Sequence, residues 1–180
     1  MSRLEAIDRA RDDLMHARDA VLAALADLEG RQWRFRPSPD AWCVAEIAEH
    51  LVLVARNVGG MVRGPLLDTP PTDEPKEAIE DLLRRRLPDR TRKATAPEGA
   101  TPVGTWSSSM ALVSAYVAAR EELLEWLRTT DAPLRRHRLP HFRFGVMDGV
   151  EWLVFLAAHD LRHVAQVEEV KRAPGYPGPE

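Results

Sequence analysis

The chain has 180 residues, enough for one domain with a sizeable core. Its composition, 44% hydrophobic and 29% charged, is typical of a soluble globular protein. A net charge of −3 argues against a general nucleic-acid-binding surface, and no run of about 18 apolar residues predicts a membrane-spanning helix.

Cysteine content and the start of the chain indicate the compartment. The single cysteine, Cys43, excludes an internal disulfide and is typical of a reducing environment. The first residues, MSRLEAIDRARDDLMHARDA, are charged and lack the apolar run of a signal peptide. We therefore expect a cytoplasmic protein that folds as one domain over residues 1–180.

Four long segments repeat apolar residues at helical spacing. The first is expected to stop before Gly30, a residue type common just after helix ends. The third is expected to turn Met110 inward, and the fourth ends before the helix-breaking tail APGYPGPE. The expected helices cover residues 2–29, 43–62, 105–128 and 150–172.

Two long connections separate these helices. Residues 64–105 hold half of the fourteen prolines and predict mostly loop, with one short helix near 76–87. A connection of this length inside a compact domain is often functional. Residues 129–148 form a second polar connection, and no segment alternates long enough to predict a sheet. The fold class is therefore all-α, a four-helix bundle with long crossover connections.

Histidines occupy the apolar stripes of two predicted helices. His159 and His163 lie four residues apart, so their side chains share one helix face about 6 Å apart. Two such imidazoles can bind one metal ion, although a pair of satisfied core histidines has the same spacing. His50 adds a third inward imidazole from another helix. Together they predict a three-histidine site with open coordination positions, if the helices bring them level.

The remaining histidines are weaker candidates. His16 lies off the apolar stripe of its helix, and His137 and His141 flank the letters RLP in an arginine-rich loop. For this pair we expect surface positions rather than the mouth of a site. The loop also contains four arginines that could receive an anionic substrate, although a solvated basic loop is the favoured interpretation. They are Arg135, Arg136, Arg138 and Arg143.

Cys43 is not expected to share a metal ion with His50. The two residues are seven positions apart, about 10 Å along a helix axis, and a bond of about 2.3 Å to a thiolate cannot span that separation. At the start of the second helix, a small buried side chain is favoured over a reactive thiol.

Two longer motifs carry a resemblance to a known family. The segments FRPSPDAWCVAEIAEHLV and LAAHDLRHVAQVEEVKRAPGYP resemble the DinB-like (DinB/YfiT) superfamily of metalloenzymes, as does AYVAAREELLEWL with its Arg120. Relatives carry a Trp-Ser/Thr turn before the second helix, where this chain has Trp42 and Cys43. Because a thiol caps a helix less well than a hydroxyl, Asp40 is the alternative cap.

The resemblance implies a four-helix bundle with a divalent metal ion, nickel or zinc, held by His50, His159 and His163. It also implies a homodimer. Family members include S-transferases that use bacillithiol or mycothiol and a mycothiol-dependent maleylpyruvate isomerase. We therefore expect a small-molecule substrate, and neither nucleic acid nor membrane as a partner.

The leading functional hypothesis is a metal-dependent enzyme, and its specific form is a transferase that acts on a low-molecular-weight thiol. Glu46 and Gln166 lie about one turn from histidines and are candidates to orient a ligand or touch substrate. For Gln166, a hydrogen bond to a neighbouring helix is an equal alternative. No carboxylate on the histidine stripe is an obvious general base. The alternatives are a metal-dependent hydrolase, and a non-catalytic dimeric bundle that serves as a binding module.

Overall fold

The structure is a computed structural model that describes residues 3–92 and 95–178. Within these residues, six α-helices, one short 3₁₀ turn and a two-stranded hairpin follow one another along the chain. Their bounds are α1 Arg3–Leu25, α2 Gly30–Arg34, α3 Val44–Arg63, α4 Glu80–Arg86, the 3₁₀ turn Glu98–Ala100, α5 Ser109–Thr129, β1 Arg138–His141, β2 Gly145–Asp148 and α6 Gly149–Lys171.

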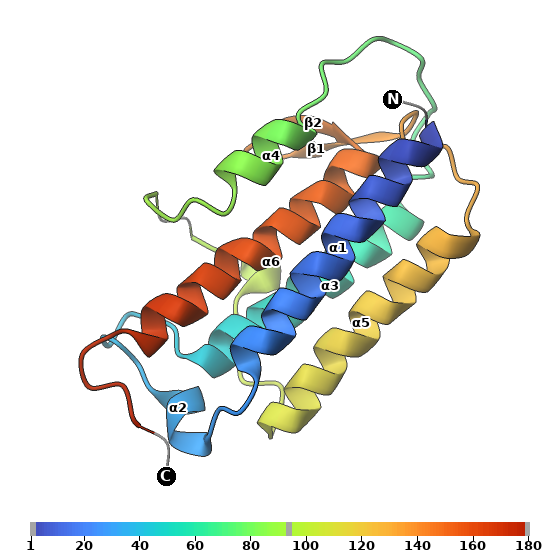
Figure 1. Cartoon of the computed structure of the whole chain (residues 1–180). Coiled ribbons are helices and arrows are strands. Elements are labelled where there is room, and N and C mark those ends of the chain that lie inside the picture. The colour runs from blue at the N-terminus through green and yellow to red at the C-terminus, as the bar shows by residue number, and fades with distance from the viewer. Residues whose placement is uncertain (1–2, 93–94, 179–180) are drawn as a thin grey trace.

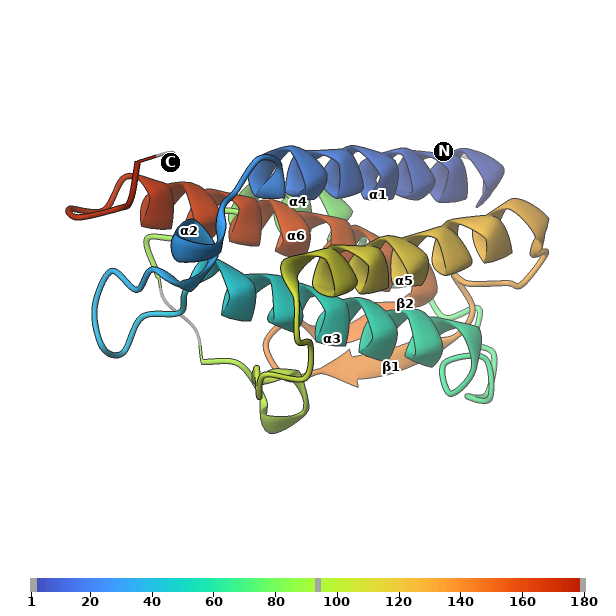
Figure 2. The ribbon, with the colours of Figure 1, turned by 90° about the horizontal axis from the view of Figure 1, so that it is seen from below.

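The four long helices form the predicted all-α bundle (Figures 1 and 2). α1 and α3 each pack against both α5 and α6, so each long helix has two neighbours. α3 and α5 point the same way, and the connection between them therefore returns along the bundle (Figure 1). α6 runs opposite to α3. In the described part of the chain, no helix has the length and apolar composition needed to cross a membrane.

The first helix is shorter than its apolar pattern predicts. It ends at Leu25 because Asp27 adopts a left-handed backbone conformation, with φ 57°, which stops the helical hydrogen-bond ladder. Gly30 does not end this helix; it begins α2, whose first turn is capped by Glu29 and Gln32. The expected start at Ser2 lies outside the described residues.

The inward face of α5 differs from the predicted one at the start of the helix, whereas Leu124 and Leu127 are buried as predicted. Met110 is 77% exposed, so its expected inward position was wrong. Tyr116 and Arg120 are buried instead, each at most 1% exposed. An apolar pattern alone could not identify this part of the buried face, because Tyr116 and Arg120 contribute polar side chains to the core.

The connection at 129–148 contains a hairpin that the sequence did not predict. β1 and β2 pair antiparallel, with Arg138 opposite Asp148 and His141 opposite Gly145. Four residues per strand, with Pro140 inside β1, are too few to show a period of two. Gly145 closes the turn with φ 73°, a conformation that glycine adopts without strain.

The junction between the hairpin and α6 is tightly constrained. The Asp148 carboxylate accepts from the Glu151 N–H at 3.0 Å, and the Glu151 carboxylate accepts from the Asp148 N–H at 2.9 Å. This capping box fixes the first turn of α6. A Cβ on Gly149 would lie 2.9 Å from side-chain atoms of Leu66 and Leu134, so only glycine fits there.

A buried ion pair joins α5 to α6. The Arg120 guanidinium donates to the Asp160 carboxylate, and neither side chain is more than 1% exposed. The Tyr116 hydroxyl donates to the same carboxylate oxygen at 2.5 Å. Removing one partner of such a pair leaves the other charge buried and uncompensated.

We predict that Arg120→Met lowers the free energy of unfolding by about 3–5 kcal/mol in urea denaturation, because Asp160 then stays buried without its cation. The matched control is Arg128→Met on the same helix, whose exposed pair with Glu125 is screened by solvent and is expected to contribute much less to stability. Equal losses in the two variants would contradict a structural role for the buried pair.

Candidate metal centre

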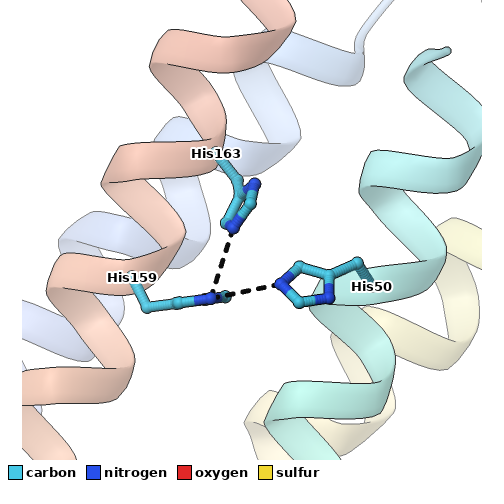
Figure 3. A group of neighbouring side chains, drawn as sticks. All are labelled: His50, His159 and His163. Atoms are coloured by element: carbon cyan, nitrogen blue, oxygen red, sulfur yellow. Dashed lines mark hydrogen bonds between the residues drawn. The ribbon is translucent and has the colours of Figure 1, made fainter. Parts of the chain in front are cut away.

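The antiparallel packing of α3 and α6 places the three candidate histidines at the same height along the bundle axis. His50 lies in the first half of α3, whereas His159 lies at the middle of α6 and His163 one turn further along it. Because the two helices are neighbours and run in opposite directions, the first half of α3 lies beside the second half of α6. Figure 3 shows the three rings pointing toward one another across this interface.

The three rings converge through their Nε2 atoms. His159 Nε2 lies 3.2 Å from His50 Nε2 and 3.2 Å from His163 Nε2. One ligand atom from each residue lies within 4.8 Å of the others, so one ion can reach all three. For comparison, two nitrogens bound to one tetrahedral ion at about 2.1 Å lie about 3.4 Å apart. The donor set and its spacing therefore fit a divalent cation.

Hydrogen bonds on the far side of two rings set their tautomers. His50 Nδ1 lies 2.6 Å from the Ala100 carbonyl oxygen, and His163 Nδ1 lies 2.8 Å from Gln166 Oε1. Both partners are acceptors, so each Nδ1 carries the proton and each neutral ring presents a bare Nε2 lone pair. His159 can supply at most one proton for the two short Nε2 contacts. A cation satisfies all three nitrogens at once.

The amide of Gln166 is itself held in place. Arg90, from the connection after α4, donates to Gln166 Oε1 at 3.1 Å, which identifies that atom as the oxygen. Arg90 also makes two hydrogen bonds to Glu169, at 2.8 and 2.9 Å. Gln166 therefore orients His163, and Arg90 orients Gln166.

Burial keeps the imidazoles neutral. His50 and His163 are buried, and His159 is partly buried with its Nδ1 enclosed and unpartnered among the described residues. Loss of hydration lowers the pKa of all three rings, and mutual repulsion lowers those of His159 and His163 further. Neutral imidazole is the form that binds a metal ion.

A cavity of about 700 Å³ opens onto the histidine cluster, large enough for a small organic molecule. Its wall includes all three histidines, Trp42 ahead of α3, and the turn between β1 and β2. The side of the cluster that protein does not fill therefore faces a space where a substrate can enter.

Glu46 and Cys43 form the start of α3. The Glu46 carboxylate accepts from the Cys43 N–H at 2.9 Å and from Arg36 at 2.6 Å. Cys43 is the N-cap residue, so the alternative cap, Asp40, is not used. Burial raises the pKa of the Cys43 thiol and disfavours the reactive thiolate. The Glu46 carboxylate is thus occupied by the Cys43 N–H at the start of α3 and by Arg36.

The other histidines do not join the cluster. His16 is exposed on α1. The surface positions expected for His137 and His141 were wrong, because the two side chains are only 8% and 6% exposed. His137 bonds to the Thr69 carbonyl at 2.8 Å, and His141 lines the cavity. Sequence reasoning missed His141 because the hairpin that buries it was not predicted.

Three of the four arginines in this region are used locally. Arg135 pairs with Glu80 and Asp148, Arg136 pairs with Asp73, and Arg138 donates to the Glu74 carbonyl. Arg143 is the member of this group that lines the cavity. Of the four arginines considered as binders of an anionic substrate, Arg143 is therefore the one that can contact a molecule in the cavity.

Comparison with known proteins establishes the family. The model of the DinB superfamily matches residues 13–167, a span that includes all three histidines. The chain belongs to the DinB superfamily. It is 24% identical over 147 residues to the uncharacterized protein YuaE of Bacillus subtilis (strain 168), covering 82% of this chain and 88% of YuaE.

The fold of this DinB-superfamily chain has a solved counterpart. The crystal structure of TT2238, described as a four-helix bundle protein, superimposes with a TM-score of 0.58 and 22% sequence identity. The match covers 91% of this chain and 98% of TT2238. This similarity supports the bundle architecture.

We predict that the metal-free protein loses stability on acidification from pH 7 to 5. In the folded protein, His50, His159 and His163 have pKa values below the ordinary 6.5, so below that pH the unfolded chain binds more protons. Each group contributes a slope of up to about 1.4 kcal/mol per pH unit, measured by urea denaturation. His163→Asn should flatten the slope; an unchanged slope in that variant contradicts the assignment.

Proposed function

We propose that this protein is a metal-dependent enzyme in which His50, His159 and His163 hold one divalent cation, nickel or zinc. The reaction that fits the site best is transfer to a low-molecular-weight thiol such as bacillithiol or mycothiol. The single observation that carries the proposal is the convergence of two fixed Nε2 lone pairs, with a third nitrogen, at the wall of a cavity.

The chain's own groups supply the ligand geometry. The Ala100 carbonyl and Gln166 hold the Nδ1 protons, so neither His50 nor His163 must lose a proton to become a ligand. Three neutral ligands leave the full positive charge of the ion in place. An ion held in this way lowers the pKa of a bound thiol or water and polarises a carbonyl.

The acid–base groups around the cavity favour a thiol over water as the nucleophile. The carboxylates among the described lining residues are Asp40 and Glu169, and Glu169 is engaged by Arg90. Asp40 is exposed in the loop before α3. A thiol, with an ordinary pKa near 8.5, needs much less help to ionise than water does. A site without a buried carboxylate base therefore suits S-transfer better than hydrolysis.

We predict that the protein, purified without a histidine tag, binds one equivalent of nickel or zinc, measured by elemental analysis and by titration with a chelator. His159→Ala should lose stoichiometric metal, because two imidazoles alone hold an ion weakly. His16→Ala removes an exposed histidine and is the matched control. Metal content unchanged in His159→Ala contradicts the assignment.

Gln166 should act as a positioning residue. We predict that Gln166→Leu weakens metal affinity about 10- to 100-fold, because His163 Nδ1 loses its acceptor. Gln166→Glu retains an acceptor oxygen and should stay within a few-fold of the unmodified protein. A merely structural role would affect the two variants alike, so the measured affinity ratio separates the two explanations.

Thiol dependence tests the reaction class. With 1-chloro-2,4-dinitrobenzene as electrophile, the thiol sulfur forms a bond to the ring carbon, chloride leaves, and the thiol proton passes to solvent. We predict metal-dependent turnover with bacillithiol or mycothiol that is lost in His159→Ala. Turnover of p-nitrophenyl acetate without any thiol, and no thiol-dependent reaction, would instead favour metal-dependent hydrolysis.

A further inference from the structure

The wall of the cavity beside the hairpin is aromatic. Phe142 and Phe144, in the turn, and Trp152 and Phe155, on α6, all line it. His141 stands at their centre, with ring centroids 4.5–5.1 Å from each of the four. Phe142 lies at the edge of the cavity and is 81% exposed, which is unusual for a large apolar side chain. This wall suits a flat apolar body.

His141 presents a hydrogen-bond donor within that wall. Its Nδ1 accepts from the backbone N–H groups of Arg143 and Phe144, at 3.1 and 3.3 Å, so the proton of the neutral ring is on Nε2. Burial lowers the pKa of His141 to about 4, with Arg143 adding to the effect, and the ring is neutral at pH 7. Nε2 has no protein partner among the described residues and is not enclosed by them.

The cavity also carries unbalanced positive charge. Its described lining contains Arg90, Arg143 and Arg162 against the carboxylates of Asp40 and Glu169. Glu169 pairs with Arg90, and Arg162 is buried and donates to backbone carbonyls of the loop after α4. The Arg143 guanidinium is exposed, lies 5.9 Å from the centroid of the Phe144 ring, and forms no ion pair with another residue of the described chain. It is the cation free to meet a ligand.

From this arrangement we infer that the hairpin side of the cavity binds an organic acid. The apolar body lies against Phe142, Trp152 and Phe155. The anionic oxygens accept from His141 Nε2–H and from the Arg143 guanidinium. This inference deepens the proposed function and rests on it in one respect: the bound acid is taken to be the molecule that reacts with the thiol.

The chemistry of the wall separates this class of ligand from its neighbours. A small inorganic anion would leave the aromatic side chains exposed to water, and a neutral aromatic would leave Arg143 without a counter-charge. Only a molecule with both parts satisfies the whole wall, since apolar burial and a charge-assisted hydrogen bond then act together.

Binding of 2-naphthoate to the full-length protein tests the inference, with 2-naphthylmethanol as the neutral analogue and acetate as the small anion. We expect calorimetry to give naphthoate the tightest binding of the three. Arg143→Gln should weaken naphthoate about tenfold and leave naphthylmethanol within about twofold. The matched control is Arg136→Gln, which removes the same charge from an exposed pair outside the cavity and should change neither.

His141→Asn provides a second variant that spares the turn. The asparagine Oδ1 can take the place of Nδ1 and accept from the two backbone N–H groups, whereas the Nε2–H donor is lost. Naphthoate binding should again weaken about tenfold, while thermal unfolding shifts little. Equal binding of naphthoate and naphthylmethanol in the unmodified protein, or an equal loss in Arg136→Gln, would overturn the inference.

The same titration repeated with EDTA keeps this inference distinct from the metal site. Naphthoate binding that persists within about threefold, and still depends on Arg143, supports the hairpin subsite even if no metal is found. Naphthoate binding that disappears with the metal, and is insensitive to Arg143→Gln, places the carboxylate on the ion and overturns the subsite.

Discussion

The buried ion pair between Arg120 and Asp160 sets the orientation on which the histidine cluster depends. Asp160 points from α6 toward α5, and the residue before it, His159, turns toward α3 and the cavity. Successive residues on a helix are about 100° apart, so fixing one direction fixes the other. A charge pair with both partners buried tolerates little rotation, because any turn of α6 would leave the charges unpaired. The ion pair between α5 and α6 therefore orients the His159 ring, which faces α3.

The connection between α3 and α5 supplies groups that help to orient two of the histidines. The carbonyl of Ala100 fixes the tautomer of His50, and Arg90 fixes the amide that orients His163. Both groups come from this connection, which returns along the bundle beside the ends of α3 and α6. The bundle places the imidazole rings, and the connection decides which nitrogen of each ring carries the proton. The connection is therefore part of the candidate site as well as a link between two helices.

The long helices and the three histidines could be predicted because both follow from helical spacing. Apolar stripes identified α3 and α6, and His50, His159 and His163 lay on them. Features that depend on contacts between distant segments could not be predicted in this way. Arg120 is buried only because Asp160 faces it, and His141 only because four-residue strands fold it inward. Arg90 reaches Gln166 across 76 positions of sequence, and no local pattern encodes that contact.

The thiol of Cys43 is buried and does not line the cavity. Cys43 is 5% exposed and is the single cysteine in the sequence. Its raised pKa keeps it protonated, and the thiol form is a poor nucleophile. An electrophile that enters the cavity therefore meets no competing protein thiolate. Under the proposed transfer to a soluble thiol, turnover could therefore proceed without alkylation of Cys43.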